Sequence, residues 1–210
     1  MKVVTERINE FRVAMGRNAA RYDLQLSDDA IRRLCVYYEL LLAWNARLHL
    51  VAPCSPAEFA TRHVRESLLL LPQLQLKARV VDIGSGAGLP IIPNLIARPD
   101  IQATLIEASA KKCVFLREAL RNCEITPQAT VIAERFENGA APAVEYVTCR
   151  ALDRFAQMLP SLVRWSPKQS TLLLFGGESL REQIERVGLE VSIVDVPDSE
   201  RRYLFVCKGR

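Results

Sequence analysis

An apolar segment that leads directly into three closely spaced glycines limits the folds open to this chain more than any other part of its sequence. Residues 80–89 read VVDIGSGAGL, which predicts a buried strand, a tight turn and the start of a helix. Glycine lets the backbone bend sharply and approach a ligand closely, and such a ligand lies beside a helix N-terminus at the carboxyl edge of a sheet. We therefore expect an α/β fold that binds a nucleotide-like ligand at this loop.

Two classes of enzyme use a loop of this kind. The dinucleotide fingerprint G-x-G-x-x-G needs its third glycine at the position where this chain has Leu89. The order found here, D-x-G-x-G-x-G, resembles the first motif of S-adenosylmethionine-dependent methyltransferases. The loop therefore favours a methyltransferase over an NAD-dependent oxidoreductase, and the oxidoreductase stays open as an alternative.

The next strand-like segment supports a ligand that carries adenosine. Residues 104–107 read TLIE, and Glu107 lies 23 residues after Gly84. A carboxylate at the end of this strand can accept hydrogen bonds from both ribose hydroxyls, in dehydrogenases and in methyltransferases. Without the loop, Glu107 would more simply be a negative charge near the start of the helix expected from Ser109.

From residue 79 onward, short strand-like segments alternate with helical ones, which predicts right-handed crossovers and a parallel sheet. The last two segments are joined by a Pro-Asp-Ser-Glu turn, which favours an antiparallel hairpin. The expected strands are 80–83, 104–107, 130–133, 146–149, 171–175, 189–195 and 203–207. We therefore expect an α/β fold with a seven-stranded sheet that is mostly parallel and closes with an antiparallel hairpin. Together with the resemblance of the loop, this implies a Rossmann-like class I methyltransferase sheet.

The N-terminal part of the chain predicts helices. Ser27, followed by two aspartates, is a good N-cap. Residues 55–58 read SPAE, a capping box with proline in the first helical position, for a helix that runs to Pro72. Because no linker follows, we divide the chain into a helical arm, residues 1–75, packed on a methyltransferase domain, residues 76–210.

The excess of positive over negative charge is confined to the first part of the chain. Residues 1–79 contain 12 Lys+Arg and 8 Asp+Glu, whereas residues 80–210 contain 16 of each, and 22 of the 28 basic residues are arginine. Guanidinium suits bidentate recognition of phosphates and base edges, although arginine usage can also follow genome base composition. We favour contact between the arm and a polyanion.

Composition excludes several other classes of protein. The chain is 50% hydrophobic and 25% charged, as in ordinary globular domains. Its six cysteines stand 10 or more residues apart without a C-x-x-C motif and it has two histidines, so we expect reduced thiols, a cytoplasmic location and no metal site. We expect no membrane attachment, because no segment approaches the ~18 apolar residues of a membrane span and the N-terminus lacks a signal-peptide core.

Five short motifs carry a more specific resemblance. They are WN at 44–45, RHVRES at 62–67, DIGSGAGLP at 82–90, AE at 133–134 and CRA at 149–151. In this order they resemble the glucose-inhibited division protein B family, bacterial enzymes that methylate N7 of a guanosine in 16S ribosomal RNA with S-adenosyl-L-methionine as the methyl donor. The resemblance covers roughly residues 44–177.

This resemblance, together with the loop and the second strand, implies a set of site residues. The residues expected to bind the cofactor are Gly84, Gly86, Leu89, Glu107, Ala133, Glu134 and Arg150. Arg62 and His63 are expected to face the substrate, which is 16S ribosomal RNA or the small ribosomal subunit, and we expect a monomer. Guanine N7 carries a free lone pair at neutral pH, so the reaction needs positioning more than a general base, and we assign no catalytic residue.

Some positions depart from the family pattern. His49 and Val51 stand where asparagine and threonine are usual, Glu66 replaces an aspartate and Ile91 a glycine. Phe175 stands where a lysine is usual at the end of the fifth strand. The missing cation leaves open a catalytically impaired RNA-binding protein on a methyltransferase fold.

Three residues have two interpretations each. Cys149 beside Arg150 could be a thiolate nucleophile, as in pyrimidine C5 methyltransferases, but a packed small residue is favoured. Trp44 could stack on a base, but a core position is favoured. His63 would usually be structural, and only the Arg-His motif raises it to a site residue.

Overall fold

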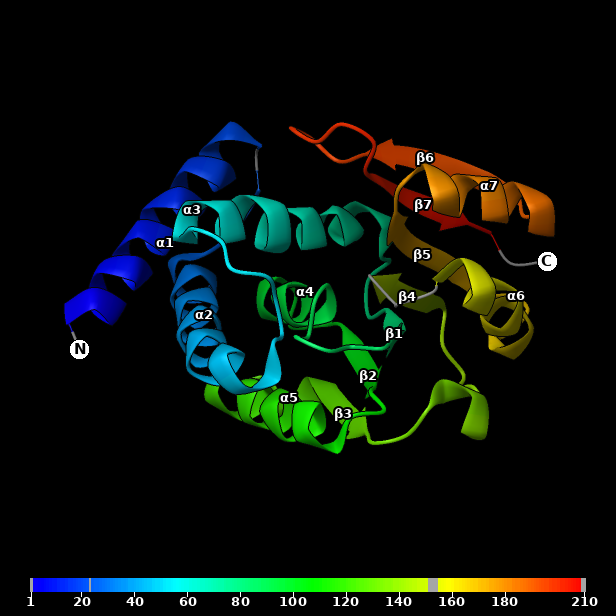
Figure 1. Ribbon diagram of the computed structural model, residues 1–210, viewed down its shortest axis with the longest axis horizontal. Coiled ribbons are helices and arrows are strands. Elements are labelled where there is room, and N and C mark those ends of the chain that lie inside the picture. The colour runs from blue at the N-terminus through cyan, green and yellow to red at the C-terminus, as the bar shows by residue number, and fades with distance from the viewer. Residues whose placement is uncertain (1, 23, 151–154, 209–210) are drawn as a thin grey trace.

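The computed structural model describes residues 2–22, 24–150 and 155–208 (Figure 1). These residues form a seven-stranded sheet in the order β3-β2-β1-β4-β5-β7-β6. The strands are β1 Arg79–Ile83, β2 Gln102–Ile106, β3 Ala129–Ile132, β4 Tyr146–Arg150, β5 Thr171–Gly176, β6 Val191–Asp195 and β7 Tyr203–Cys207. The predicted fold class is confirmed.

The strand pairing brings the carboxyl ends of the central strands together. β1 to β5 pair in parallel, and Ile83 lies opposite Ile106 on one side and Cys149 on the other. β7 pairs antiparallel with both β5 and β6, which is the predicted closing hairpin. β2 ends one residue before Glu107, so this carboxylate stands just beyond the strand and not within it as expected.

Helices cover both faces of the sheet and bury two separate cores. They are α4 Ile91–Ala97, α5 Ala110–Asn122, α6 Phe155–Trp165 and α7 Glu178–Val187, with 3-10 turns η3 Thr126–Gln128 and η4 Phe136–Asn138. Phe115 of α5 and Ile92 of α4 belong to one core, whereas Leu159 of α6 and Ile184 of α7 belong to the other. This is the two-faced covering expected for a parallel sheet.

The N-terminal segment folds into a set of helices that pack on the same side of the sheet as α4 and α5 (Figure 1). Its elements are α1 Lys2–Arg21, α2 Asp28–Leu48, α3 Pro56–Phe59, the π-helix η1 Ala60–Arg65 and the 3-10 helix η2 Leu68–Gln73. Both predicted N-caps form, since Ser27 Oγ accepts from Ala30 N and Ser55 Oγ accepts from Glu58 N, each at 3.1 Å. The single helix expected from Ser55 to Pro72 is not uniform, because the π-helix η1 and the 3-10 helix η2 follow the short α3.

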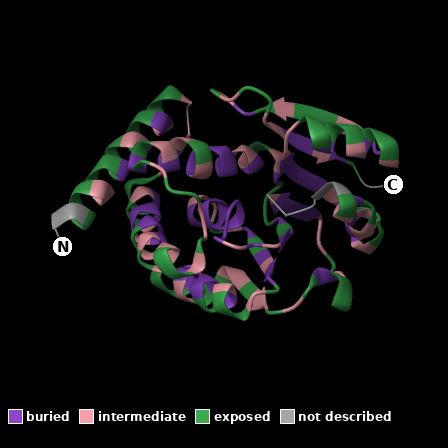
Figure 2. Cartoon of the chain, in the orientation of Figure 1, coloured by how far each residue is buried: buried purple, intermediate pink, exposed green. Residues whose placement is uncertain are grey.

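This arm shares a hydrophobic core with the sheet. Phe11, Tyr37 and Phe59 are fully buried in the same cluster as Leu105 of β2, and Figure 2 shows the buried stripes of the arm helices facing the sheet. Each large buried apolar side chain contributes about 1.5–3 kcal/mol. The arm is therefore held chiefly by burial of its apolar faces.

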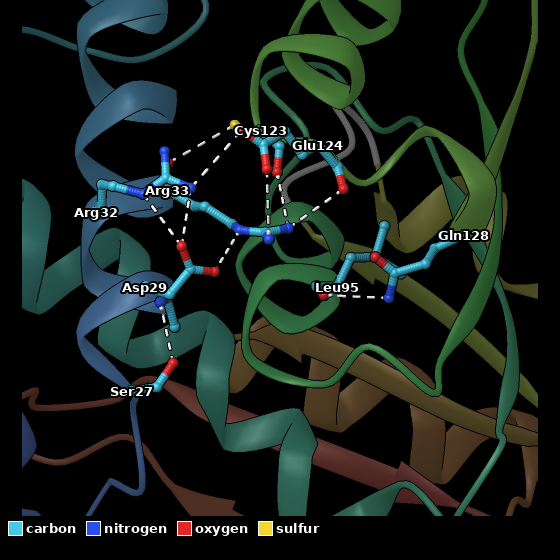
Figure 3. Close-up of polar contacts among 9 residues, drawn as sticks. Ser27, Asp29, Arg32, Arg33, Leu95, Cys123, Glu124 and Gln128 are labelled. Carbon is cyan, nitrogen blue, oxygen red and sulfur yellow. Dashed lines mark hydrogen bonds and ion pairs between the residues drawn. The ribbon is translucent and has the colours of Figure 1, made fainter.

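Polar contacts of Arg33 add to this packing (Figure 3). Its Nη1 donates to the carbonyls of Cys123 and Glu124, at 3.4 and 3.2 Å, where α5 ends. Its Nε lies 2.7 Å from Asp29 Oδ2 on the same helix. A cation at the carbonyl end of α5 also complements the helix dipole.

Several arginines of the arm make contacts within the protein. Arg7 donates to Tyr38 Oη and to the Cys54 carbonyl. Arg65 is 4% exposed and pairs with Asp198. The positive surplus of the arm is therefore weaker support for contact with a polyanion than its sequence alone indicated. Among the described residues, the structure contains no helix with the length and hydropathy of a membrane span.

Candidate cofactor and substrate site

A pocket of about 930 Å³ opens at the carboxyl edge of β1, β2 and β4. Eight of the nine predicted site residues line it: Gly84, Gly86, Leu89, Glu107, Glu134, Arg150, Arg62 and His63. Ala133 is exposed and lies beside the pocket-lining Glu134 without being part of the lining itself. The pocket therefore unites the glycine loop, the second-strand carboxylate and two residues of the arm.

The glycine loop has the backbone that its sequence predicts. Gly84, Gly86 and Gly88 have φ of 67°, 53° and 79°, which is the left-handed region that glycine enters without penalty. A Cβ on Gly88 would lie 2.3 Å from Ile92 Cδ1, whereas a Cβ on Gly86 would come no nearer than 3.6 Å to the Gly84 carbonyl. Gly88 therefore serves close packing on α4, and Gly86 leaves room on the pocket side.

Glu107 connects the second strand to this loop. Its Oε2 accepts from Gly86 N at 2.9 Å, and its Oε1 accepts from Ser109 N at 2.8 Å. Ser109 is the N-cap of α5, so the interaction with the helix start occurs as well as the pocket position. The carboxylate is 8% exposed and fixed by two backbone donors, and it still lines the pocket.

The aspartate of the D-x-G-x-G-x-G motif is buried and does not line the pocket. Asp82 is fully buried in β1. Burial raises the pKa of Asp82 to about 8, and the charge of Glu107 contributes in the same direction. Two neighbouring carboxyl groups in one site favour protonation of the more buried one.

Arg150 joins the end of β4 to the π-helix η1. Its guanidinium donates to the carbonyls of Arg62 and His63, at 3.0 and 3.2 Å, and to Ser67 Oγ at 3.3 Å. Its side chain is 7% exposed. π-helical turns often occur at functional sites, and here the turn presents two carbonyls to one guanidinium. Ala151, the last residue of the CRA motif, lies outside the described residues.

His63 is an uncharged imidazole in this setting. Its Nδ1 lies 3.0 Å from Arg150 Nη2, and since a guanidinium can only donate, Nδ1 is the acceptor and Nε2 carries the proton. Burial, together with the positive charges of Arg150, Arg202 and Arg62, lowers the pKa of His63 to about 4. The Arg-His motif thus provides the pocket with a neutral ring.

Phe175, which stands where the family usually has a lysine, is a core residue. Phe175 is 5% exposed and packs in the core, and the Arg150 guanidinium lies 5.9 Å from the centre of its ring. A different cation, Arg202, lines the pocket from the start of β7. Arg202 Nη2 is 2.7 Å from Glu66 Oε1, and Glu66 is 1% exposed. The pocket therefore has a cation close to the end of β5 although Phe175 is not one.

Two further alternatives receive structural answers. Cys149 is fully buried within β4 and packs in the second core, which agrees with the packed residue that was favoured over a thiolate nucleophile. Trp44 packs on the first core, and its Nε1 donates to Glu118 Oε2 at 3.1 Å. Its indole is therefore engaged with α5 and is not a stacking platform in the pocket.

Sequence patterns missed part of the pocket lining. Lys112, Arg135, Gln157, Met158 and Arg202 all line it. Lys112 follows the N-cap of α5 and Arg135 follows the AE motif, so their proximity to predicted residues was a usable signal. Arg202 had no local signal, because its place depends on the pairing of β7 with β5.

Comparison with known proteins agrees with this geometry. The family model described as "GidB: rRNA small subunit methyltransferase G" matches residues 30–200. Curated relatives named "Ribosomal RNA small subunit methyltransferase G" include a protein of Anaeromyxobacter sp., 33% identical over 89% of each chain. Another, from Neisseria meningitidis, is 31% identical over 97% of this chain and 98% of its own.

Solved structures with the same fold are more distant in sequence. The tRNA (m1A58) methyltransferase TrmI from Aquifex aeolicus has a TM-score of 0.55 at 13% identity, over 70% of this chain and 69% of its own. TYW2 from M. jannaschii, solved in complex with AdoMet, has a TM-score of 0.53 at 12% identity, over 70% and 74%. These two likenesses concern the fold alone, whereas the matches in sequence run over most of the length, and by them the chain belongs to the GidB family of small-subunit ribosomal RNA methyltransferases.

Proposed function

We propose that this protein is an S-adenosylmethionine-dependent methyltransferase that methylates N7 of a guanosine in 16S ribosomal RNA. The observation that carries the proposal is the pocket of a GidB-family chain in which the glycine loop and Glu107 face two residues of the arm. We further propose that the protein acts as a monomer in the cytoplasm, where ribosomal subunits are assembled.

The residues present fit the proposed cofactor. The open side of Gly86 leaves room for a ligand against the backbone, and Glu107 places a carboxylate where ribose hydroxyls need an acceptor. A volume of about 930 Å³ lies near the top of the usual range for ligand pockets, about 300–1,000 Å³. We propose that Gly84, Gly86, Leu89, Glu107, Ala133, Glu134 and Arg150 hold the cofactor.

The proposed reaction asks this chain to position the base and not to deprotonate it. When bound, the cofactor supplies a methyl group on a positively charged sulfur. Guanine N7 has a free lone pair, so alignment is the main requirement, and good alignment can lower a barrier by roughly 7–11 kcal/mol in model reactions. Neutral His63 can donate a hydrogen bond from Nε2 to a base edge without adding a positive charge that would repel the sulfur of the cofactor.

The division into arm and domain fits the same proposal. Residues 1–75 would contribute the RNA-facing side of the pocket through Arg62 and His63, and residues 76–210 would hold the cofactor. The side chain of Arg62 is 60% exposed. It can bind a phosphate in place of Glu58, its present ion-pair partner. N7 lies in the deep, narrow major groove of A-form RNA, so the target base should be unpaired.

The decisive test is methyl transfer with labelled S-adenosylmethionine and small-subunit RNA or particles that lack the modification. We expect label in 16S RNA, at N7 of one guanosine when mapped by mass spectrometry. Failure to label RNA or particles at several magnesium concentrations would refute the proposal. Competing titrations separate the NAD-dependent alternative, since S-adenosylhomocysteine should bind and NAD should not.

A further inference from the structure

A buried tyrosine of the arm contacts the glycine loop directly. Tyr37 of α2 is fully buried, and its Oη donates to the carbonyl of Ala87 at 2.6 Å. Ala87 lies between Gly86 and Gly88, the two glycines that end the loop. The arm therefore reaches the cofactor loop through one side-chain hydrogen bond as well as through apolar packing.

The loop is held on its other side by the second strand. The amides of Gly84 and Ser85 donate to the Ile106 carbonyl, at 2.8 and 3.2 Å, and Gly86 N donates to Glu107 Oε2. Three of the five loop amides thus point toward β2 and its carboxylate. The Ala87 carbonyl accepts instead from Tyr37 of α2, so hydrogen bonds tie the loop both to β2 and to α2.

A loop built on glycines needs such restraints. Glycine has more backbone freedom than any other residue, and ordering it costs more entropy. A site already held in its binding conformation avoids that cost when the ligand arrives. Because the phenol lies in a dry interior, its hydroxyl stays protonated, with its pKa well above the usual value through burial, and it remains a donor at any physiological pH.

We propose that Tyr37 is a positioning residue for the cofactor, and that its hydrogen bond to Ala87 holds the glycine loop in the conformation that binds S-adenosylmethionine. This inference rests on the proposed function, since it assigns that ligand to the loop. It also makes the arm part of the cofactor site, because α2 then helps to hold the loop at Ala87, next to Gly86.

The neighbouring residue provides a matched control. Tyr38 is also buried on α2, but its Oη accepts from Arg7 Nη2 at 3.5 Å and its ring stacks on Phe11. Tyr37→Phe and Tyr38→Phe each remove one buried hydroxyl from the same helix and keep the ring. Only the first variant removes a bond to the loop.

The experiment is a calorimetric titration of both variants and the unaltered protein with S-adenosylhomocysteine, at a temperature where circular dichroism shows all three folded. We expect the Kd of Tyr37→Phe to rise about tenfold, as for a buried carbonyl that loses its donor, and that of Tyr38→Phe to stay unchanged. Equal affinities in all three proteins, or an equal loss in both variants, would overturn the proposal.

Amide hydrogen exchange gives a second readout that needs no ligand. We expect amides 84–88 to exchange faster in Tyr37→Phe than in Tyr38→Phe, with α2 itself protected equally in both. Equal exchange at the loop would also overturn the role of Tyr37. If the unaltered protein failed to bind S-adenosylhomocysteine, the proposed function would fail, while the exchange result would still decide whether Tyr37 holds the loop.

Discussion

Arg150 Nη2 lies 3.0 Å from His63 Nδ1, and this contact joins the carboxyl end of a central strand to the helical arm. The same guanidinium donates to two carbonyls of the π-helix and lies 3.6 Å from buried Glu66. The side of the pocket formed by the arm therefore depends on one buried cation.

Removal of this cation should destabilise the protein. We expect Arg150→Ala to lower the free energy of unfolding by about 3 kcal/mol or more, because buried Glu66 loses one of its two nearby cations and two carbonyls of the π-helix lose a charged donor. The control is Arg62→Ala, which removes only an exposed pair with Glu58 and should cost about 0.5 kcal/mol. Urea unfolding followed by circular dichroism measures both, and similar losses would show that the Arg150 contacts are weak.

Acid should destabilise the protein in part through His63. Its pKa is near 4 in the folded protein, against 6.5 for an ordinary imidazole. The unfolded chain therefore binds this proton more tightly, so the stabilising contribution is complete above about pH 6.5 and is lost as the pH falls toward 4. We expect the free energy of unfolding to fall over this range in the unaltered protein and to fall less in His63→Gln.

The imidazole itself can be observed by NMR. The chain has two histidines, so a His49→Gln variant leaves His63 as the one ring to titrate. We expect a midpoint near pH 4 and a spectrum of the tautomer protonated at Nε2. A midpoint at the ordinary value would mean that the ring is hydrated and not held against Arg150.

Two loop glycines should respond differently to alanine. Gly88→Ala places a methyl group 2.3 Å from Ile92 Cδ1, so we expect a loss of about 3 kcal/mol in unfolding free energy from strain and overpacking together. Gly86→Ala meets no such clash and should cost about 1–2 kcal/mol from its left-handed backbone. Because Gly86 lines the pocket, we also expect Gly86→Ala to weaken the binding of S-adenosylhomocysteine. The reverse ranking in unfolding experiments would contradict this assignment of the two glycines.

The second-strand carboxylate should matter for cofactor affinity. Glu107→Gln puts an amide NH₂ against either Gly86 N or Ser109 N, both of which are donors, so we expect about a tenfold rise in the Kd for S-adenosylhomocysteine. Glu118→Gln is the matched control, because Glu118 also accepts from an N–H group, that of Trp44 on α2, and it does not line the pocket. Calorimetry should find the control unchanged, and equal affinities in all proteins would remove Glu107 from the site.

The architecture could be predicted from local patterns in the sequence. The alternation of strands and helices, the loop glycines at 84, 86 and 88 and the Pro-Asp-Ser-Glu turn each act within a few residues, so they could be recognised without knowledge of the fold. They predicted seven strands, the closing hairpin and the position of the pocket, all of which the structure has. The ordered motifs also identified the family.

The contribution of the arm to the site could be seen only in the folded molecule. Tyr37 and Ala87 are 50 residues apart in the chain, and Glu66 and Arg202 are 136 apart. The sequence pattern of α2 could not distinguish Tyr37, which reaches the loop, from a simple core residue. Nor could the charge count show that Arg7, Arg33 and Arg65 are already paired with other groups of the protein. Such contacts depend on which surfaces meet after the helices pack on the sheet, and packing is a property of the whole chain that no local pattern contains.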